Sequence, residues 1–130
     1  MKSQDLEQTC YDLIYAAKYD LLGAVNNKCT CMYHFADKVC AIGYLLPDSI
    51  HSKIDKLEED GYTINTDSAV ELVQHIPSVG KILKKHSLSL DLAQELQVIH
   101  DESFTAEVSS KQQIKNYITS MESFMSENIE

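Results

Sequence analysis

The first predicted helix reads LEQTCYDLIYAAKYDL over residues 6–21. Its apolar residues recur mostly at three- and four-residue steps, which is the repeat of a helix that buries one face. This apolar stripe comprises Leu6, Cys10, Leu13, Ile14, Ala17 and Leu21. Gly23 follows the stripe and is predicted to end the helix, because glycine favours the backbone conformation just past a helix C-terminus.

Three tyrosines of this segment lie four residues apart and form what we call the tyrosine row: Tyr11, Tyr15 and Tyr19. Helical geometry places them along one side, beside the apolar stripe. Tyrosine offers a large amphipathic contact surface, so one interpretation is a binding interface. The other interpretation is that the rings flank the core and shield it. Because the apolar stripe suffices to dock this helix, we expect part of the row to reach solvent or a partner.

Helical patterns dominate most of the remaining chain. Pro47 is predicted to open a helix that ends at Gly61, since proline suits a first turn and glycine a helix end. The later helix starts are predicted from capping residues. They are a Ser68 and Glu71 capping box, Ser78 after the break at Pro77, Ser89, and a Ser110 and Gln113 capping box.

Residues 29–44, CTCMYHFADKVCAIGY, depart from this pattern. Their β-branched and aromatic residues favour two short strands joined by a turn of two or three residues within Ala36-Asp37-Lys38. Gly43, inside the second expected strand, indicates a bulge or a close backbone approach. The predicted fold is therefore a single domain over 1–130 of the mostly-α α+β class, with five or six short helices packed around one β-hairpin.

Composition limits the classes of partner. The net charge is −9 and all eleven basic residues are lysines, so we expect no direct binding to nucleic acid, whose phosphates and guanine edges favour arginine. No apolar run approaches the ~20 residues of a membrane span, and the first residues lack the apolar segment of a signal peptide. We therefore expect a cytoplasmic protein with no membrane association and with cysteines in the thiol form.

The densest cluster of metal-ligand residue types is Cys29-x-Cys31-x2-His34-x5-Cys40. Three thiols and an imidazole suit tetrahedral zinc, but the spacing differs from the usual pairs of zinc ligands. Buried packing of small thiols in a hairpin is the favoured interpretation, because only the ligand types match a zinc site, and we expect no metal and no cofactor. A three-residue turn would set His34 across from Cys40, and such a pair could activate a thiolate nucleophile.

We also name a candidate ligand pocket near the hairpin, formed by residues with polar or titratable side chains. They are His34, Cys40, Tyr44, His100 and Asp101. His100 and Asp101 gather at a predicted helix end, where interaction with the helix dipole is a sufficient explanation of the histidine.

The segment from Cys40 to Asp48, CAIGYLLPD, resembles a C-A-(I/V)-G-x-L-(I/L)-P-D stretch in small uncharacterised proteins of bacteriophages and bacteria. Those proteins carry a preceding C-x-Y arm, matched by residues 31–33, and a following Glu-Gly element, loosely matched by residues 59–61. Residues 92–101 are similar to their L-x-x-L-Q-x-I-H-D stretch. The chain departs from the family at His34, often a basic residue there, and at Asp60. The resemblance covers about residues 29–101, implies no established activity, and suggests a phage accessory protein of the bacterial cytoplasm.

The leading functional hypothesis is a small phage-type accessory protein that binds a host bacterial protein, such as a host defence factor, and modulates or inhibits it. It depends on the lack of catalytic motifs, the acidic charge, the tyrosine row and the resemblance. The alternative is capture of a small ligand, a nucleotide or metabolite. A Cys/His-dependent enzyme using Cys40 or His100 ranks third, and self-association into a homo-oligomer stays open.

Overall fold

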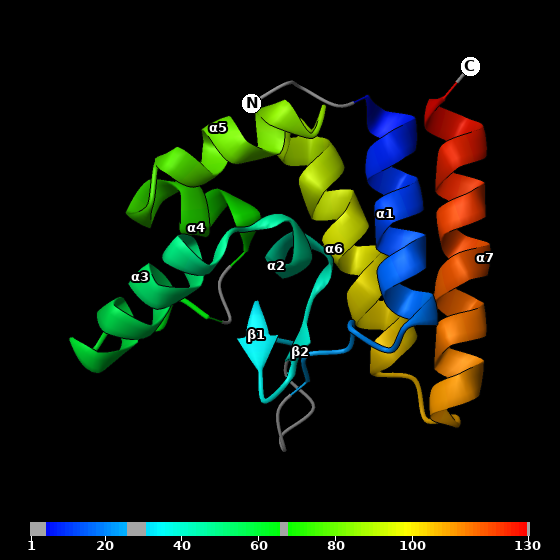
Figure 1. Cartoon of the computed structure of the whole chain (residues 1–130), viewed down its shortest axis with the longest axis horizontal. Helices are drawn as coiled ribbons and strands as arrows, with labels where there is room; N and C mark the ends of the chain where they lie inside the picture. Colours follow the sequence, from blue (N-terminus) through cyan, green and yellow to red (C-terminus); the bar gives the residue numbers. More distant parts are fainter. Residues whose placement is uncertain (1–4, 26–30, 66–67, 130) are drawn as a thin grey trace.

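The computed structural model describes residues 5–25, 31–65 and 68–129. Within these ranges the chain forms seven helices and one two-stranded antiparallel hairpin (Figure 1). The helices are α1 (Leu6–Lys18), α2 (Ala41–Leu45), α3 (Asp48–Glu59), α4 (Ala69–His75), α5 (Ser78–Lys85), α6 (Leu90–Phe104) and α7 (Ser110–Asn128). The strands are β1 (His34–Phe35) and β2 (Lys38–Val39). The predicted mostly-α α+β class is confirmed.

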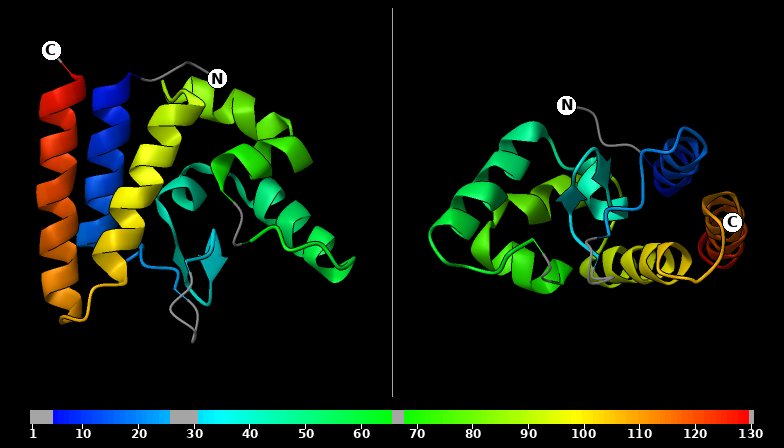
Figure 2. Two further views of the ribbon diagram at one scale, coloured as in Figure 1. Left: turned by 180° about the vertical axis from the view of Figure 1, so that it is seen from behind. Right: turned by 90° about the horizontal axis from the view of Figure 1, so that it is seen from below.

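Helix α7 packs against both α1 and α6. Helices α1 and α7 lie at one side of the molecule and run in opposite directions, whereas α3, α4 and α5 lie at the other side (Figures 1 and 2). The short helix α2 sits between these groups, above the hairpin, and packs on α6. The first and last helices of the described chain are therefore neighbours in space.

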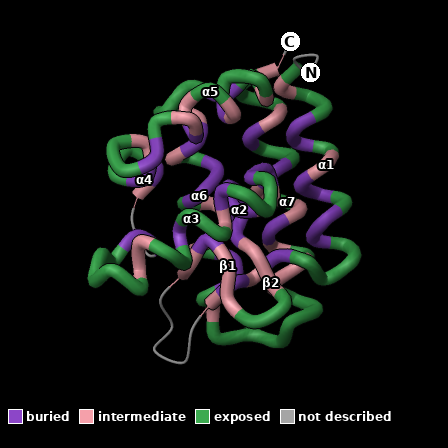
Figure 3. The backbone as a smooth tube through the Cα atoms, turned by 60° about the vertical axis from the view of Figure 1, so that its left-hand side comes forward, coloured by how far each residue is buried: buried purple, intermediate pink, exposed green. Residues whose placement is uncertain are grey.

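The core is one cluster of buried apolar side chains to which nearly every helix contributes. Buried backbone follows the inward faces of the helices, and the outer faces are exposed (Figure 3). Fully buried members include Leu13 of α1, Leu96 of α6 and Met121 of α7. Burying each such side chain contributes roughly 1.5–3 kcal/mol, so the three-helix contact is a main source of stability.

Capping residues explain most helix starts. The Ser68 and Glu71 capping box is present, and the Ser89 side chain accepts a hydrogen bond from the Leu92 N–H, as predicted. Three predicted starts are wrong by one residue, and the first is Pro47, which precedes the first helical residue of α3, Asp48. Ser109, rather than Ser110, caps α7, and Pro77 precedes the first helical residue of α5, which is Ser78.

The end of α1 also differs from the prediction. The helix ends at Lys18, and Asp20 turns the chain with a positive φ of 59° before Gly23 is reached. Gly23 itself has a φ of 101°, which favours glycine, and an added Cβ there would lie 3.1 Å from the Phe104 ring. This glycine therefore shapes the loop after α1 instead of ending the helix.

The second expected strand is wrong beyond Val39, because Cys40 caps helix α2. The Cys40 Sγ accepts a hydrogen bond from the Gly43 N–H at 3.2 Å, and packing on α6 outweighs the strand preference of Ile42 and Tyr44. Gly43 nevertheless makes the predicted close approach, since an added Cβ would lie 2.0 Å from the Tyr33 carbonyl oxygen.

The hairpin has the shorter of the two predicted turns. His34 pairs with Val39 and Phe35 with Lys38, so the turn contains only Ala36 and Asp37. Ala36 has a φ of 56°, as tight hairpin turns require. The three-residue turn that would set His34 across from Cys40 is therefore wrong.

Among the helices that the structure describes, none combines the length and the apolar character needed to cross a bilayer.

Candidate functional site

The tyrosine row follows the outward face of α1, with Tyr11 and Tyr15 in the helix and Tyr19 at its C-cap. Tyr11, Tyr15 and Tyr19 expose 53%, 55% and 63% of their surface, and the rings of Tyr15 and Tyr19 touch with centroids 4.4 Å apart. The expectation that the row reaches solvent is confirmed, and the interpretation that the rings mainly shield the core is not supported. Because successive members are rotated by about 40° around the helix, the row crosses the face of α1 obliquely.

The part of the row that contains Tyr15 is close to α2. Burial is the main cause that raises the pKa of the Tyr44 phenol, and the charges of Asp12 and Tyr15 raise it further. Tyr44, half-buried on α2, is therefore within electrostatic range of Tyr15, and it does not line the hollow beside Asp101. Leu21, just past the helix, exposes 40% of its surface and extends the exposed face.

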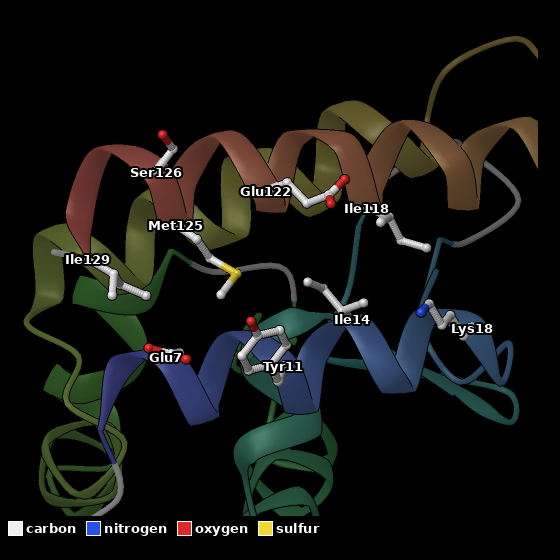
Figure 4. Close-up of a pocket in the computed structure, with 9 residues that line it drawn as sticks. All are labelled: Glu7, Tyr11, Ile14, Lys18, Ile118, Glu122, Met125, Ser126 and Ile129. Atoms are coloured by element: carbon white, nitrogen blue, oxygen red, sulfur yellow. The ribbon is translucent and has the colours of Figure 1, made fainter.

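Near Tyr11, the row borders a groove between α1 and α7, which we call the α1/α7 groove. It has a volume of about 480 Å³ and is lined by Glu7, Tyr11, Ile14, Lys18, Ile118, Glu122, Met125, Ser126 and Ile129. Figure 4 shows Tyr11 and Met125 facing each other across it, with Glu7 near one end and Lys18 near the other. Its floor is apolar and its charges lie at the rim and ends.

The other predicted pocket residues fall into two further places. Cys40, His100 and Asp101 lie around the start of α2 and the C-terminal half of α6, whereas His34 contacts α3. Cys29 lies outside the described residues. The five residues of the candidate ligand pocket are therefore not brought together.

Asp101 is the centre of a polar cluster. Its Oδ1 accepts hydrogen bonds from Gln97 Nε2 and His100 Nδ1, each at 3.0 Å, and its carboxylate also pairs with the Cys31 thiol. Burial raises the pKa of the Cys31 thiol, and the hydrogen bond to Asp101 raises it further. Burial also raises the pKa of Cys40 to about 12. Both thiols are therefore protonated at neutral pH and are poor nucleophiles.

The hydrogen bonds of His100 bear on metal binding. The ligand atoms of Cys31, His100 and Asp101 all lie within 4.8 Å of one another. However, the Gly23 N–H donates to His100 Nε2 at 3.1 Å, so the neutral ring carries its proton on Nδ1 and donates it to Asp101. A metal on Nδ1 would move that proton to Nε2, against the Gly23 N–H. The arrangement disfavours a metal here, and its absence stays a prediction.

A hollow of about 340 Å³ borders this cluster. Polar side chains line much of it, including those of Asn65, Glu71, Gln94 and Asp101. The Gln94 Oε1 is buried and has no hydrogen-bond partner within the described ranges. The hollow is the nearest counterpart of the predicted ligand pocket, although only Asp101 of the five predicted residues lines it.

His34 belongs to a chain of hydrogen bonds that sequence reasoning missed. Its Nδ1 lies 2.5 Å from His51 Nδ1, its Nε2 lies 2.6 Å from Asp55 Oδ1, and His51 Nε2 donates to the Gly43 carbonyl at 2.8 Å. The only sequence signal was the spacing of His51 and Asp55, four residues apart on one helix.

This chain has a definite proton count. The Gly43 carbonyl and the Asp55 carboxylate only accept, so each ring carries a hydrogen on its Nε2, and a third hydrogen lies between the two Nδ1 atoms. Burial, the largest effect on His51, lowers its pKa and therefore favours His51 Nδ1 as the acceptor of that third hydrogen. The chain joins β1, α2 and α3, and its partners include no nucleophile.

The comparisons with known proteins give no relative of this chain. No model of a known protein family, no curated protein and no solved structure matches this chain.

Proposed function

We propose that this chain is a phage-type accessory protein that binds a host bacterial protein through the tyrosine row and modulates or inhibits it. The observation that carries the proposal is the exposure of all three tyrosines on one helix face. The resemblance of the CAIGYLLPD segment to phage and bacterial proteins supports the phage origin.

The physical argument concerns the energy of tyrosine anchors. A tyrosine ring buries a large area with few rotatable bonds, and it keeps a hydroxyl for hydrogen bonding. The contact between Tyr15 and Tyr19 limits the freedom of both rings before binding. Such pre-ordering lowers the entropy lost on association, so these two residues are the best candidates for binding hot spots.

The charge around the row indicates the chemistry of the partner. Glu7 and Asp12 lie on the same helix as the row, and the whole chain carries a net charge of −9. A partner with a basic surface would be attracted over long range, and its association would slow as salt is added.

The experiment compares Tyr15→Ala with Tyr62→Ala in capture of proteins from bacterial lysate. Tyr62 exposes 51% of its surface but lies after α3, so it is a matched control. We expect Tyr15→Ala to melt like the wild type and to lose about 2 kcal/mol of binding free energy, which is about 30-fold in Kd.

The partner should therefore be captured by the wild type and by Tyr62→Ala but depleted with Tyr15→Ala. Capture that is equal for all three proteins would contradict the proposal. So would a Tyr15→Ala variant that melts far lower and binds normally once folded, since Tyr15 would then be a structural residue.

A second candidate function is capture of a small polar metabolite in the hollow beside Asp101. The unpaired Gln94 Oε1 favours it, because a buried acceptor without a partner costs about 1–3 kcal/mol that a ligand donor would recover. Glu71 and Asp101 disfavour a nucleotide phosphate there. Mass spectrometry of small molecules released from purified protein tests this, with Gln94→Leu as the variant expected to lose the ligand.

A further inference from the structure

Two parallel stripes run along both α1 and α7. The inner stripes are buried in the core and include Cys10, Leu13 and Ala17 on α1 and Tyr117, Met121 and Phe124 on α7. The outer stripes line the α1/α7 groove at positions 7, 11, 14 and 18 and at positions 118, 122, 125 and 129. Steps of four, three and four residues are those of the contact positions of a coiled coil.

A helix with two such stripes has room for two layers of neighbours. The inner layer is filled by the protein core, whereas no described part of this chain covers the outer layer. Tyr11 exposes 53% of its surface there, and Ile118, Met125 and Ile129 are only half-buried. A second pair of helices laid on this groove would complete a four-helix bundle.

We propose that the occupant is a second copy of this chain, related by a two-fold axis that lies in the interface perpendicular to the helices. The charges of the outer α1 stripe support this occupant. Glu7 lies at one end of the stripe and Lys18 at the other, so the acidic end of one copy meets the basic end of an antiparallel copy. An isologous contact requires this self-complementarity, whereas an unrelated helix does not.

The symmetry fixes the register. Antiparallel α1 helices centred between residues 12 and 13 set Glu7 opposite Lys18 of the partner subunit. They also set Tyr11 opposite Ile14 of the partner subunit, which is mostly buried in its own core and exposes 8% of its surface. Each ion pair and each apolar contact then occurs twice.

This inference goes beyond the proposed function. Tyr15 and Tyr19 do not line the groove, so a dimer would cover Tyr11 but leave these two tyrosines exposed on each subunit. The dimer and the host contact therefore stand or fall separately, since Tyr15→Ala tests one and the groove charges test the other.

The test is sedimentation of the full chain at low ionic strength, with the charges reversed singly and together. The molecular mass of the wild type from sedimentation should be twice the 14.7 kDa of a single chain. Glu7→Lys and Lys18→Glu should each shift it to the monomer, because each change sets like charges against each other at both ends. The double variant Glu7→Lys/Lys18→Glu restores opposite charges and should dimerise again.

Lys53→Glu, an exposed charge reversal on α3, is the matched control and should leave the dimer intact. Thermal melts confirm that each variant is folded. The weakest stable dimers have a Kd on the order of 100 μM. A wild type that is still monomeric at about 100 μM therefore overturns the proposal. A double variant that stays monomeric overturns the antiparallel arrangement and with it the proposal.

Discussion

Gly43→Ala should destabilise this protein, although the same change stabilises an ordinary helix. Gly43 lies in α2, and an added Cβ would sit 2.0 Å from the Tyr33 carbonyl oxygen. That oxygen cannot simply withdraw, because it accepts a hydrogen bond from the Cys40 N–H at 3.2 Å. Either α2 or the segment before β1 must therefore move.

The size of the effect follows from three contributions. Replacing glycine by alanine in a helix favours folding by about 1 kcal/mol. Overpacking against a fixed backbone atom costs about 3 kcal/mol, at the upper end of the usual range. The shift also weakens the hydrogen bonds from Cys40 to Tyr33 and from His51 to Gly43, worth about 1 kcal/mol each. The net loss in the free energy of unfolding is then about 3–4 kcal/mol.

Urea unfolding followed by circular dichroism measures this loss, with Gly80→Ala as the control. Gly80 lies in α5, and a Cβ there would meet only Val73 Cγ1 at an ordinary 3.5 Å. The control should be as stable as the wild type or up to about 1 kcal/mol more stable. If the two variants unfold at the same urea concentration, the close approach does not constrain the fold and the reasoning fails.

Two further predictions concern buried titratable groups. The Cys40 thiol, whose pKa burial raises to about 12, should react with a thiol reagent far more slowly in the native protein than in urea, as peptide mass spectrometry would report. Rapid modification of Cys40 in the native protein would contradict its burial. Cys40→Ala should lower the free energy of unfolding by about 1–2 kcal/mol, because the cap and the packing of the thiol are lost. Burial lowers the pKa of His86, so the unfolded chain binds its proton first, and the free energy of unfolding should fall as the pH drops below 6.5. His86→Gln should flatten this dependence in urea unfolding between about pH 7.5 and pH 5.5, and an unaltered slope would refute the assignment.

The helices could be predicted where an apolar face repeats over several turns. Helices α1, α3, α4, α5, α6 and α7 all follow from such repeats or from their capping residues. Helix α2 could not be predicted, because five residues are too few to show a repeat and Ile42 and Tyr44 individually prefer strands. What makes it a helix is the Cys40 cap and the packing on α6, and neither is visible in the local sequence.

The candidate sites also divide into one that could be predicted from the sequence and others that could not. Exposure of the tyrosine row followed from its spacing on α1, because a single helix determines which residues share a face. The Asp101 cluster joins Cys31 to α6, and the His34 chain joins β1 to α3. Such groups depend on how distant elements pack, so their residues could be named individually but not grouped correctly.

The pairing of α1 with α7 has a consequence for synthesis on the ribosome. About 100 residues separate the two helices, so at roughly 5–20 residues per second α1 waits on the order of 5–20 s for the helix that covers it. During that interval Leu13 and Ile14 have no native neighbour on α7, and the nascent chain exposes the apolar face of an amphipathic segment. Closing so long a loop is also slow, which makes this contact a late event in folding and the nascent α1 a natural client for chaperones.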